Sequence, residues 1–330
     1  MSKPTLTIGI PTRNRNDLIT DLLDDVFSQL TDKTRARVRI LITDNASDVP
    51  YDAVIERYSK SHPESISYIR NKVNIGFSAN VNKAVQSAES DFVLIMSDDD
   101  GLMPGTIDAV LSMIDAHPDV GIGMLGHATY DKMMTKETRP FMSSVYGYFS
   151  NGKDYLDRIP SFPDALISGY VVNRLYWIEN FSHDFTEINS IHFIMAPLLI
   201  AKYPCFALGD KGYVKYRSDM GHWSIATDPL YPFPMFASYL KSCKINKKLL
   251  CTRIHEKMYC TTMRTVMGFI IRNKVLGYNF PRKEIFGVLS PYLDNSTFRI
   301  RLFNLMMQLL MYTPMWMLYV PFRWLVPEKL

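Results

Sequence analysis

The chain has 330 residues, of which 47% are hydrophobic and 21% are charged, and its formal net charge at pH 7 is +4. This composition is typical of a folded globular protein and excludes wholesale disorder, and the length allows two domains or one domain with an extension. The charge is unevenly distributed, because residues 241–283 contain eleven Lys or Arg and a single acid, Glu256, so we expect an anionic partner for the carboxyl-terminal third.

Strands and helices are predicted to alternate through the first hundred residues. Short apolar or β-branched runs predict strands at 6–10, 39–43, 66–69 and 92–96, and the first should end at Pro11, which cannot donate to a central ladder. Between them, apolar residues at helical spacing predict helices, which span 16–30, 51–61 and 78–88. Four alternations with short connections favour an α/β fold with a parallel, doubly wound sheet.

Polar residues follow each predicted strand, at the edge where such a sheet binds its ligands. After the strand at 92–96 come Asp98, Asp99 and Asp100, whose repulsion and desolvation require a cation or hydrogen-bond donors nearby. These residues alone fit either a divalent metal site or a solvated acidic turn. No G-x-G-x-x-G turn follows the first predicted strand, and a Walker-type loop is absent as well, so we expect a nucleotide site made of carboxylates, amides and a metal.

Four segments occur in a fixed order within residues 4–125, and together they are specific although each motif is weak by itself. They are Ile8–Arg15, Asp44–Ser47, Asn74–Asn80, and Ser97–Asp100 with Pro104-Gly105. This ordered set resembles family 2 glycosyltransferases, which are GT-A enzymes that use nucleotide sugars.

The resemblance implies which residues bind the donor nucleotide. Pro11, Thr12 and Asp44 would contact the nucleoside, with Asp44 accepting a hydrogen bond from the base, while Asn74 and Gly76 would line the pocket. The full implied set is Pro11, Thr12, Arg13, Arg15, Asp44, Asn74, Gly76, Asp98, Asp99 and Arg217.

Simpler alternatives remain open for several of these residues. Arg13 and Arg15 could be solvated turn residues. Asn74 could merely cap a turn, and Gly76 could only supply a positive φ angle.

The resemblance also implies that the aspartate cluster holds Mn²⁺ or Mg²⁺ against the diphosphate, because hard oxygen ligands suit these ions. The family usually has an acid where Ser97 stands, so the ligand set is open. Alternate residues at a strand end share a face, which favours Asp98 and Asp100 as the metal ligands. Aligning the chain with the family without a gap favours Asp99 instead. A later segment, 214–223, adds Arg217 and His222 as candidates for phosphate or metal, with a surface turn as the alternative.

The middle of the chain is expected to bind the acceptor. Residues 127–165 contain aromatic side chains that could stack on sugar rings or belong to the core. At the start of a helix at 193–202, the position of the family's general base falls on His192, which can accept a proton near neutral pH. A structural histidine is the alternative, and Glu187 and Asp184 are then the other candidate bases.

The carboxyl-terminal third is predicted to be helical, basic and membrane-associating. No nucleic-acid module accompanies the basic residues, so an anionic membrane surface ranks above nucleic acid as the partner. Residues 302–322 have no charge but contain Asn304, Gln308 and two prolines, which favours an in-plane amphipathic anchor over a span. A core helix or an oligomer contact is the alternative.

These expectations combine into one hypothesis. Residues 1–125 would bind the nucleotide sugar, residues 126–230 the acceptor and residues 231–330 the membrane. The protein would be a metal-dependent, inverting glycosyltransferase at the cytoplasmic face of a bacterial inner membrane. It would act on a polyprenyl-diphosphate-linked oligosaccharide, and is most similar to O-antigen sugar transferases, including the abequosyltransferase-like group. The rival hypotheses are a nucleotidyltransferase and an inactive membrane-bound protein that binds sugar nucleotides.

Overall fold

The computed structural model describes residues 3–139, 145–159, 166–188, 190–218, 232–247, 250, 252–275 and 282–313. The contacts between residues divide the chain into two compact units. One is formed by residues 1–160 and 164–220, and the other by residues 161–163 and 221–330. Each unit has a core of its own, since Ile8 is fully buried in the first and Met263 in the second.

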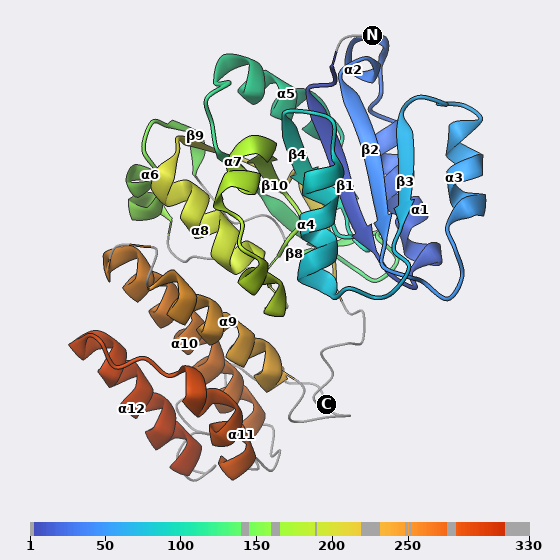
Figure 1. The fold of residues 1–330 in the computed structure, drawn as a ribbon. Coiled ribbons are helices and arrows are strands. Elements are labelled where there is room, and N and C mark those ends of the chain that lie inside the picture. The colour runs from blue at the N-terminus through green and yellow to red at the C-terminus, as the bar shows by residue number, and fades with distance from the viewer. Residues whose placement is uncertain are drawn as a thin grey trace. The chain divides into compact units, whose positions relative to one another are not determined.

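The first unit is built on an eight-stranded sheet with the order β3-β2-β1-β4-β10-β6-β11-β9 (Figure 1). Six strands point the same way, whereas β10 and β9 run antiparallel to their neighbours. The α/β class is therefore confirmed, with a mixed sheet. The strands are β1 Leu6–Thr12, β2 Val38–Asp44, β3 Ile66–Arg70, β4 Phe92–Ile95, β6 Ile122–Leu125, β9 Tyr146–Phe149, β10 Tyr170–Asn173 and β11 Cys205–Leu208.

Helices cover both faces of this sheet. On one face, Ile19 of α1 and Val110 of α5 belong to the same buried cluster as Ile8 of β1. On the other face α4 approaches β1 closely, since a Cβ added to Gly9 would lie 3.5 Å from the Cβ of Ala84. The helical segments are α1 Asn16–Phe27, α2 Asp32–Arg35, α3 Asp52–Ser59, α4 Phe77–Ser87, α5 Thr106–Ala116, α6 Gly152–Arg158, α7 Arg174–Asn180, the 3-10 helix η1 His183–Glu187, and α8 His192–Lys202.

The prediction that the first strand ends at Pro11 is wrong, because β1 continues to Thr12 and pairs Pro11 with Thr43 of β2. The reason is the side of β1 on which the backbone nitrogen of Pro11 lies. The Gly9 carbonyl accepts the Met96 N–H on the β4 side, so Pro11, two residues later, faces that side as well. Pairing of β1 with β4 ends at Gly9, so the missing N–H of proline costs no strand-to-strand bond there.

A second sheet in this unit brings a distant segment to the end of β4. Its order is β5-β12-β7-β8, with β5 Gly101–Leu102, β7 His127–Tyr130, β8 Glu137–Arg139 and β12 Val214–Arg217. β5 follows Asp100 directly and pairs antiparallel with β12. The carboxyl end of β12 therefore lies beside the aspartate cluster.

The described part of the second unit is helical, with α9 Pro232–Asn246, α10 Thr252–Val275, α11 Arg282–Leu289, the 3-10 turn η2 Ser290–Tyr292 and α12 Phe298–Tyr312. Asp294 joins three of these helices. Its carboxylate accepts from Lys247, directly after α9, at 2.8 Å and from His255 of α10 at 2.7 Å, and its backbone carbonyl accepts from Asn304 of α12 at 2.5 Å. Burial would raise the pKa of Asp294, but the donors around it hold that pKa well below its usual range.

Helix α12 has apolar residues on two sides. Ile300, Met307 and Met311 are buried in the unit. A second row, which we call the outer face of α12, recurs at spacings of four and three residues and is 43–76% exposed; it comprises Phe298, Leu302, Leu305, Leu309 and Tyr312. Among the described residues, none of the helices combines the length and apolarity needed to cross a membrane. Residues 314–322 of the predicted anchor lie outside the described residues.

Candidate active site at the carboxyl edge of the sheet

The three aspartates lie in a turn directly after β4. The Asp100 N–H donates to the Ser97 carbonyl at 3.3 Å, and the residues Asp98 and Asp100 are each only 3% exposed. Because β4 ends at Ile95, strand alternation does not extend to this turn and gives no reason to pair Asp98 with Asp100.

Asp98 and Asp99 converge on one cation. Nη1 of Arg15 donates to Asp98 Oδ1 and to Asp99 Oδ2, at 2.8 Å in both cases. The other oxygen of Asp98 accepts from the hydroxyl of Thr12, at the end of β1, at 2.5 Å. Thr12 Oγ1 is also 2.7 Å from the Tyr51 hydroxyl, which in turn accepts the Arg15 backbone N–H at 2.9 Å. The ends of β1 and β4 are thus joined by hydrogen bonds at the cluster.

Asp100 is held by residues from two other strands. Its Oδ2 accepts from the hydroxyl of Ser168, just before β10, at 2.5 Å, and its Oδ1 accepts the backbone N–H of Arg217, at the end of β12, at 3.1 Å. Ser168 also accepts the Ser97 N–H at 2.9 Å. Ser168 was not among the predicted site residues. It precedes a strand of only four residues whose partner strands are distant in the sequence, so no local pattern identifies it.

Arg217 is buried and bonded to the protein itself. It is 4% exposed, and its guanidinium donates to the Asp99 carbonyl at 2.7 Å, to the Lys132 carbonyl at 2.6 Å and to Asp21 at 2.5 Å. The structure therefore places Arg217 behind the aspartate turn, where it fixes the backbone rather than presenting its charge to solvent.

The cluster is short of positive charge. Burial raises the pKa of Asp98 to about 6, with Arg15 opposing the shift and Asp99 adding to it. Burial and the neighbouring Asp99 also raise the pKa of Asp100. Burial would lower the pKa of Arg15, but the attraction of Asp98 and Asp99 outweighs this effect and raises it. A divalent cation would relieve the repulsion among these carboxylates.

The residues present fit such an ion when the substrate supplies further ligands. In the part of the chain that the structure describes, no three His, Cys, Asp or Glu side chains are arranged to hold a metal. However, Mg²⁺ is commonly bound by one or two carboxylates together with substrate phosphates and water, and Asp98 and Asp99 already share one cation. His222, the other predicted metal ligand, lies outside the described residues.

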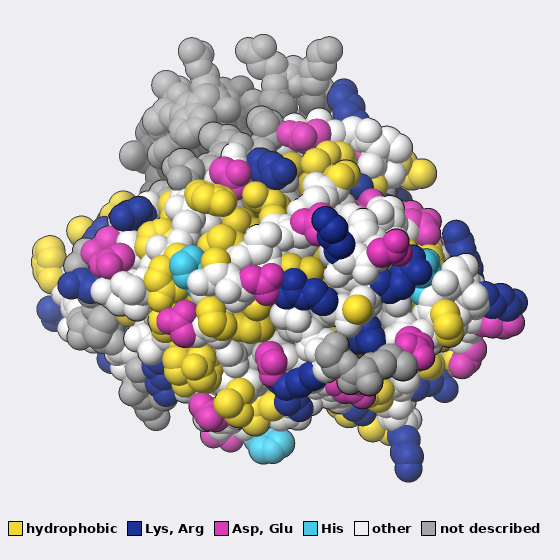
Figure 2. Space-filling view, turned by 90° about the horizontal axis from the view of Figure 1, so that it is seen from above, with side chains coloured by type: hydrophobic (Ala, Val, Ile, Leu, Met, Phe, Trp, Pro, Cys, Tyr) yellow, Lys and Arg dark blue, Asp and Glu magenta, His cyan; other side chains and the backbone are white. Residues whose placement is uncertain are grey.

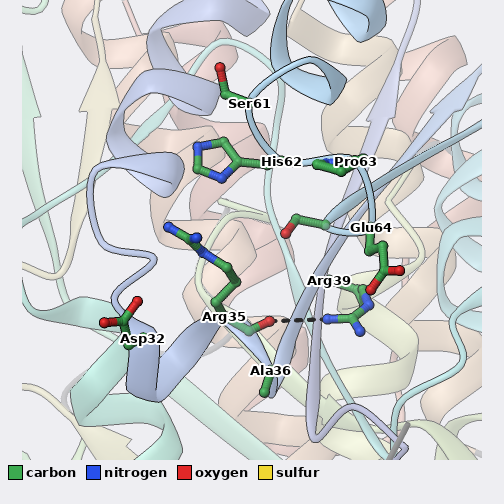
Figure 3. A pocket seen from close by; sticks show the side chains of 9 residues that line it. Asp32, Arg35, Ala36, Arg39, Ser61, His62, Pro63 and Glu64 are labelled. Atoms are coloured by element: carbon green, nitrogen blue, oxygen red, sulfur yellow. Dashed lines mark hydrogen bonds between the residues drawn. The ribbon is translucent and has the colours of Figure 1, made fainter.

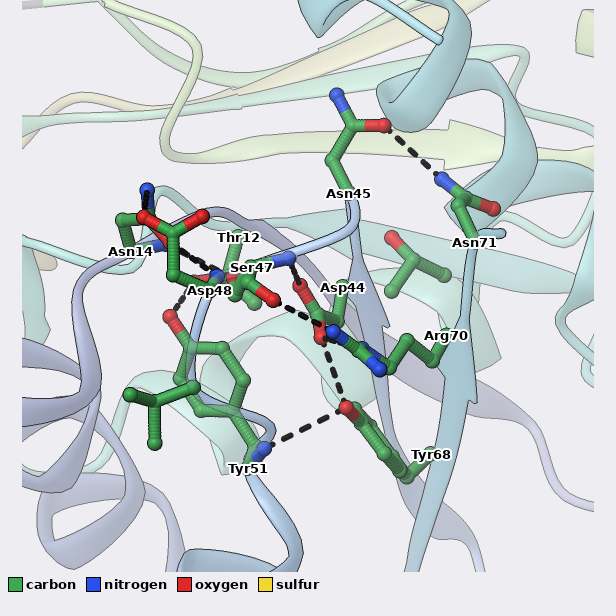
Figure 4. A network of polar contacts seen from close by, with 12 residues as sticks. Thr12, Asn14, Asp44, Asn45, Ser47, Asp48, Tyr51, Tyr68, Arg70 and Asn71 are labelled. Atoms are coloured by element: carbon green, nitrogen blue, oxygen red, sulfur yellow. Dashed lines mark hydrogen bonds and ion pairs between the residues drawn. The ribbon is translucent and has the colours of Figure 1, made fainter. Parts of the chain in front are cut away.

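Asp44, at the end of β2, is fully buried in a network shown in Figure 4. Its Oδ1 accepts the Ser47 N–H at 2.8 Å, and its Oδ2 accepts from the Tyr68 hydroxyl at 2.8 Å and from Arg70 Nε at 3.1 Å. Burial and the bond to Asp44 raise the pKa of Tyr68 to about 12. Asp44 therefore shapes the loop after β2, and Tyr68 and Arg70 are site residues that the motifs did not identify.

The predicted donor loop at Asn74 and Gly76 is tied to the end of β2. Asn45 Nδ2 donates to Asn74 Oδ1 at 2.7 Å, and the same oxygen accepts the Gly76 N–H at 3.0 Å. Asn45 Oδ1 accepts the Ile75 N–H at 2.9 Å. Gly76 has φ +86°, the left-handed region that favours glycine, and directly precedes α4.

The turn after β1 presents its two predicted arginines differently. Asn14 has φ +55° and is held in place by the Asn14 N–H, which donates to Ser47 Oγ at 2.9 Å. Arg13 is exposed to solvent, whereas Arg15 turns toward the aspartates and Pro11 is buried in β1. The structure therefore brings together Thr12, Arg15 and the cluster, and leaves Arg13 at the surface.

His192 begins α8 and is 5% exposed. Its ring centre lies 6.1 Å from that of Tyr170, which follows Ser168 by two residues. The segment before it is fixed to the start of α4, because Ser78 Oγ donates to the Ile188 carbonyl and accepts the Ile191 N–H at 3.2 Å. By contrast, the alternative bases Asp184 and Glu187 lie in η1 and are exposed.

The aromatic residues predicted to stack on sugars or to pack in the core separate into two groups. Phe149 and Tyr155 are buried and contact each other edge to face, with ring centres 5.5 Å apart. Tyr148 stacks on His117 with a centre-to-centre distance of 4.0 Å. Tyr146 is exposed and Tyr148 is half-buried, so these two have surface available to a ligand.

A pocket of about 470 Å³ lies elsewhere on the first unit, around α2, the start of β2 and residues 61–65 (Figure 3). Arg35, Arg39 and Glu64 line it, but its lining contains none of the predicted site residues. β2 begins at this pocket and ends at Asp44, so the pocket and Asp44 lie at opposite ends of the strand.

Acidic and basic side chains are interspersed on the face that Figure 2 shows, which differs from the uniformly positive surface that suits a nucleic acid.

Comparison with known proteins supports the resemblance noted from the motifs. Residues 7–169 match the model of the family described as "Glycosyl transferase family 2". Over 115 residues the chain is 30% identical to abequosyltransferase RfbV of Salmonella typhimurium, which covers 35% of this chain and 34% of that protein. The matched stretch thus spans about a third of the length of the curated relatives.

Two solved structures show the same fold over most of the chain. TarS residues 1–349 from S. aureus, in complex with UDP-GlcNAc, has a TM-score of 0.67 at 15% identity, covering 96% of this chain and 88% of that one. The mannosyltransferase PcManGT from Pyrobaculum calidifontis, in complex with GDP-Man and Mn²⁺, has a TM-score of 0.54 at 14% identity, covering 94% and 86%. The fold is therefore GT-A-like.

Proposed function

We propose, from the match of residues 7–169 to the model of glycosyl transferase family 2, that the protein transfers a sugar from a nucleoside diphosphate sugar to a hydroxyl group. The observation that carries the proposal is the convergence of Asp98 and Asp99 on one cation, beside the strand ends that carry Thr12 and Asp44. Such a site suits a diphosphate bound together with a metal.

The donor and the metal would meet at this edge. Asp98 and Asp99 would hold Mg²⁺ or Mn²⁺, and the nucleoside would lie along the loops after β1 and β2. When bound, the ion would stabilise the negative charge of the departing diphosphate. Like the donors in the two structural neighbours, the donor would be a sugar on a nucleoside diphosphate.

We assign the general base to His192, with inversion at the sugar. Its Nε2 or Nδ1 would take the proton of the acceptor hydroxyl as that oxygen attacks the anomeric carbon and the diphosphate leaves. Burial at the start of α8, beside Tyr170, would give the imidazole a fixed orientation. Asp184 and Glu187 are exposed in η1 and are the alternative bases.

We further propose a lipid-linked oligosaccharide acceptor, as in O-antigen or other surface polysaccharide synthesis, at the cytoplasmic face of the bacterial inner membrane. Two features support this. The matched relative is an abequosyltransferase, and the outer face of α12 is apolar, with exposed Arg299 and Arg301 beside it. An apolar row flanked by cations is typical of helices that lie in an anionic membrane interface.

The experiment that tests the catalytic proposal is donor hydrolysis by purified protein. Nucleoside diphosphate sugars are supplied one at a time with Mn²⁺ or with EDTA, and release of the nucleoside diphosphate is measured. We expect hydrolysis that requires the metal, and a loss of about 100-fold or more in Asp98→Asn, because stabilisation of the leaving group is then removed.

The matched control is Asp108→Asn, which changes an exposed aspartate on α5 and should hydrolyse donors like the wild type. Absence of metal-dependent hydrolysis or transfer with every donor would contradict the proposed function. Equal activity in Asp98→Asn and Asp108→Asn would show that the cluster is not the metal site.

A further inference from the structure

Arg15 occupies a special place in the aspartate cluster. Its Nη1 lies 2.8 Å from one oxygen of Asp98 and 2.8 Å from one oxygen of Asp99, so a single nitrogen donates to both carboxylates. The remaining oxygen of Asp98 accepts from Thr12, and that of Asp99 accepts from Ser97. Among the described residues, the contact with Arg15 is therefore the one place where a cation neutralises both of these carboxylates at once.

The side chain of Arg15 can leave without disturbing the fold. Its side chain is 32% exposed, whereas that of Asp98 is 4% exposed. Its backbone is fixed independently, because the Arg15 N–H donates to the Tyr51 hydroxyl and the Arg15 carbonyl accepts the Leu18 N–H in the first turn of α1. Rotation about side-chain bonds is enough to carry the guanidinium away from the aspartates.

We infer that Arg15 holds the place of the divalent ion between Asp98 and Asp99 and moves to the donor diphosphate when metal and donor bind. This inference rests on the proposed function. A divalent ion that bonds the same two oxygens competes with the guanidinium, because two positive charges in contact with one carboxylate pair repel each other. The displaced guanidinium then lacks an anion, and a diphosphate bound with the ion supplies one, since Arg binds phosphate oxygens well.

The exchange predicts a thermodynamic coupling between two ligands. Metal alone must displace Arg15 without giving it a new partner, so it binds weakly. With a nucleoside diphosphate present, Arg15 gains the phosphate as partner and the metal binds more tightly. Because coupling is reciprocal, the nucleotide must bind more tightly with metal by the same factor. Removing the charge of Arg15 should raise the affinity for metal alone and reduce the coupling.

The experiment compares Mn²⁺ binding by wild type, Arg15→Gln and Arg15→Lys, using the electron paramagnetic resonance signal of free Mn²⁺. Each protein is titrated alone, with UDP and with GDP, and titrations without protein account for Mn²⁺ held by the nucleotide in solution. For Arg15→Gln we expect binding of Mn²⁺ alone to tighten about three- to tenfold and the nucleotide-induced gain to fall by a similar factor. Arg15→Lys keeps the charge and should remain close to the wild type.

The matched control is Arg57→Gln, which removes one exposed positive charge on α3 and should leave Mn²⁺ binding unchanged. Melting temperatures with and without Mn²⁺ provide a second measurement, in which Mn²⁺ should stabilise Arg15→Gln more than the wild type. Unchanged or weaker Mn²⁺ binding in Arg15→Gln would overturn the role of Arg15 while leaving the metal site intact. No Mn²⁺ binding to any of the proteins, with either nucleotide, would overturn the proposed function and this inference together.

Discussion

Asp98 is a buried carboxylate whose charge is only partly compensated. Thr12 and Arg15 donate to it, yet burial and Asp99 still raise its pKa to about 6. A group whose folded-state pKa lies above its unfolded value binds more protons in the folded protein, so between those two values the stability falls as the pH rises. Ionised Asp98 therefore destabilises the folded, metal-free protein, and a bound cation would relieve this effect.

This gives a prediction for the stability of the metal-free protein. Between about pH 4 and pH 6, Asp98 should lower the free energy of unfolding by about 3 kcal/mol in total as it ionises, since each pKa unit corresponds to about 1.4 kcal/mol. Asp98→Asn should lack this contribution, and should melt at a higher temperature than the wild type at pH 7.5. Thermal melts in EDTA from pH 4.5 to pH 7.5 measure the difference.

Asp108→Asn is again the control, because Asp108 is exposed on α5. A difference between wild type and Asp98→Asn that does not change with pH would show that Asp98 is not a strained carboxylate. Titrating groups distant from the cluster are common to both proteins and cancel in the comparison, whereas Asp100, whose pKa the charge of Asp98 helps to raise, contributes to the difference.

At the scale of the elements, the aspartate turn is positioned by strands from three parts of the chain. β1 supplies Thr12, the segment leading into β10 supplies Ser168, and β12 supplies Arg217. The guanidinium of Arg217 reaches the Asp99 carbonyl, the Lys132 carbonyl and Asp21, so it links the turn to the second sheet and to α1. Arg217 acts as a positioning residue in this arrangement.

Replacing Arg217 by lysine should therefore reduce stability. A single ammonium group cannot reach three acceptors in different directions, so buried carbonyls lose their donors at a cost of about 2–4 kcal/mol. We expect a lower melting temperature already in the absence of nucleotide. Chemical denaturation of Arg217→Lys and of Arg57→Lys, an exposed control, measures the effect.

The result also separates two roles for Arg217. If Arg217→Lys melts like the wild type but binds nucleoside diphosphate more weakly, the residue contacts phosphate and does not position the turn. That outcome would support the phosphate-binding role that the sequence predicts for Arg217.

The elements that the sequence predicted best are those with local signals. The strands that became β1 to β4 are short apolar runs followed by polar turns, and the family's motifs lie at their ends. β10 gave no such signal, because its four residues gain their stability by pairing with β4 and β6, which are remote in the sequence. Ser168, Arg15 and Tyr51 likewise take their roles from contacts between elements, which periodicity and composition do not contain.

At the scale of the whole molecule, the two units differ in charge. Residues 232–313 contain thirteen Lys or Arg and three acids, although the net charge of the chain is only +4. α12 itself has no acid, and the carbonyls of Leu310, Met311 and Thr313 at its end already accept hydrogen bonds from Lys274. Helix α12 of a second copy would offer no carboxylate to Arg301, whereas an anionic lipid surface would neutralise it; Arg299 already lies 3.7 Å from Glu256.

Binding to lipid vesicles tests this interpretation. The double variant Leu305→Asp with Leu309→Asp places two charges on the outer face of α12, and should lose about 100-fold or more in affinity for vesicles containing phosphatidylglycerol, because apolar burial is replaced by the desolvation of two carboxylates. Co-sedimentation measures the bound fraction, and high salt should weaken the binding of the wild type.

Leu175→Asp is the matched control, since Leu175 is an exposed leucine of the first unit. Unchanged sedimentation of the double variant with these vesicles would show that α12 does not contact lipid. A wild type that is dimeric without lipid, together with a monomeric double variant, would show instead that a second copy covers the outer face.

The hydroxyl groups of Thr12 and Tyr51 impose a direction on the turn after β1. Ionised Asp98 can only accept, so the single hydroxyl hydrogen of Thr12 must point to it. The hydrogen of Tyr51 must then point to Thr12, which leaves the Tyr51 oxygen to accept the Arg15 N–H. Three dipoles in series are thus aligned toward one negative charge and strengthen one another. A protonated Asp98 can itself donate and no longer enforces that order, so the alignment of the two hydroxyl groups depends on the charge of the carboxylate.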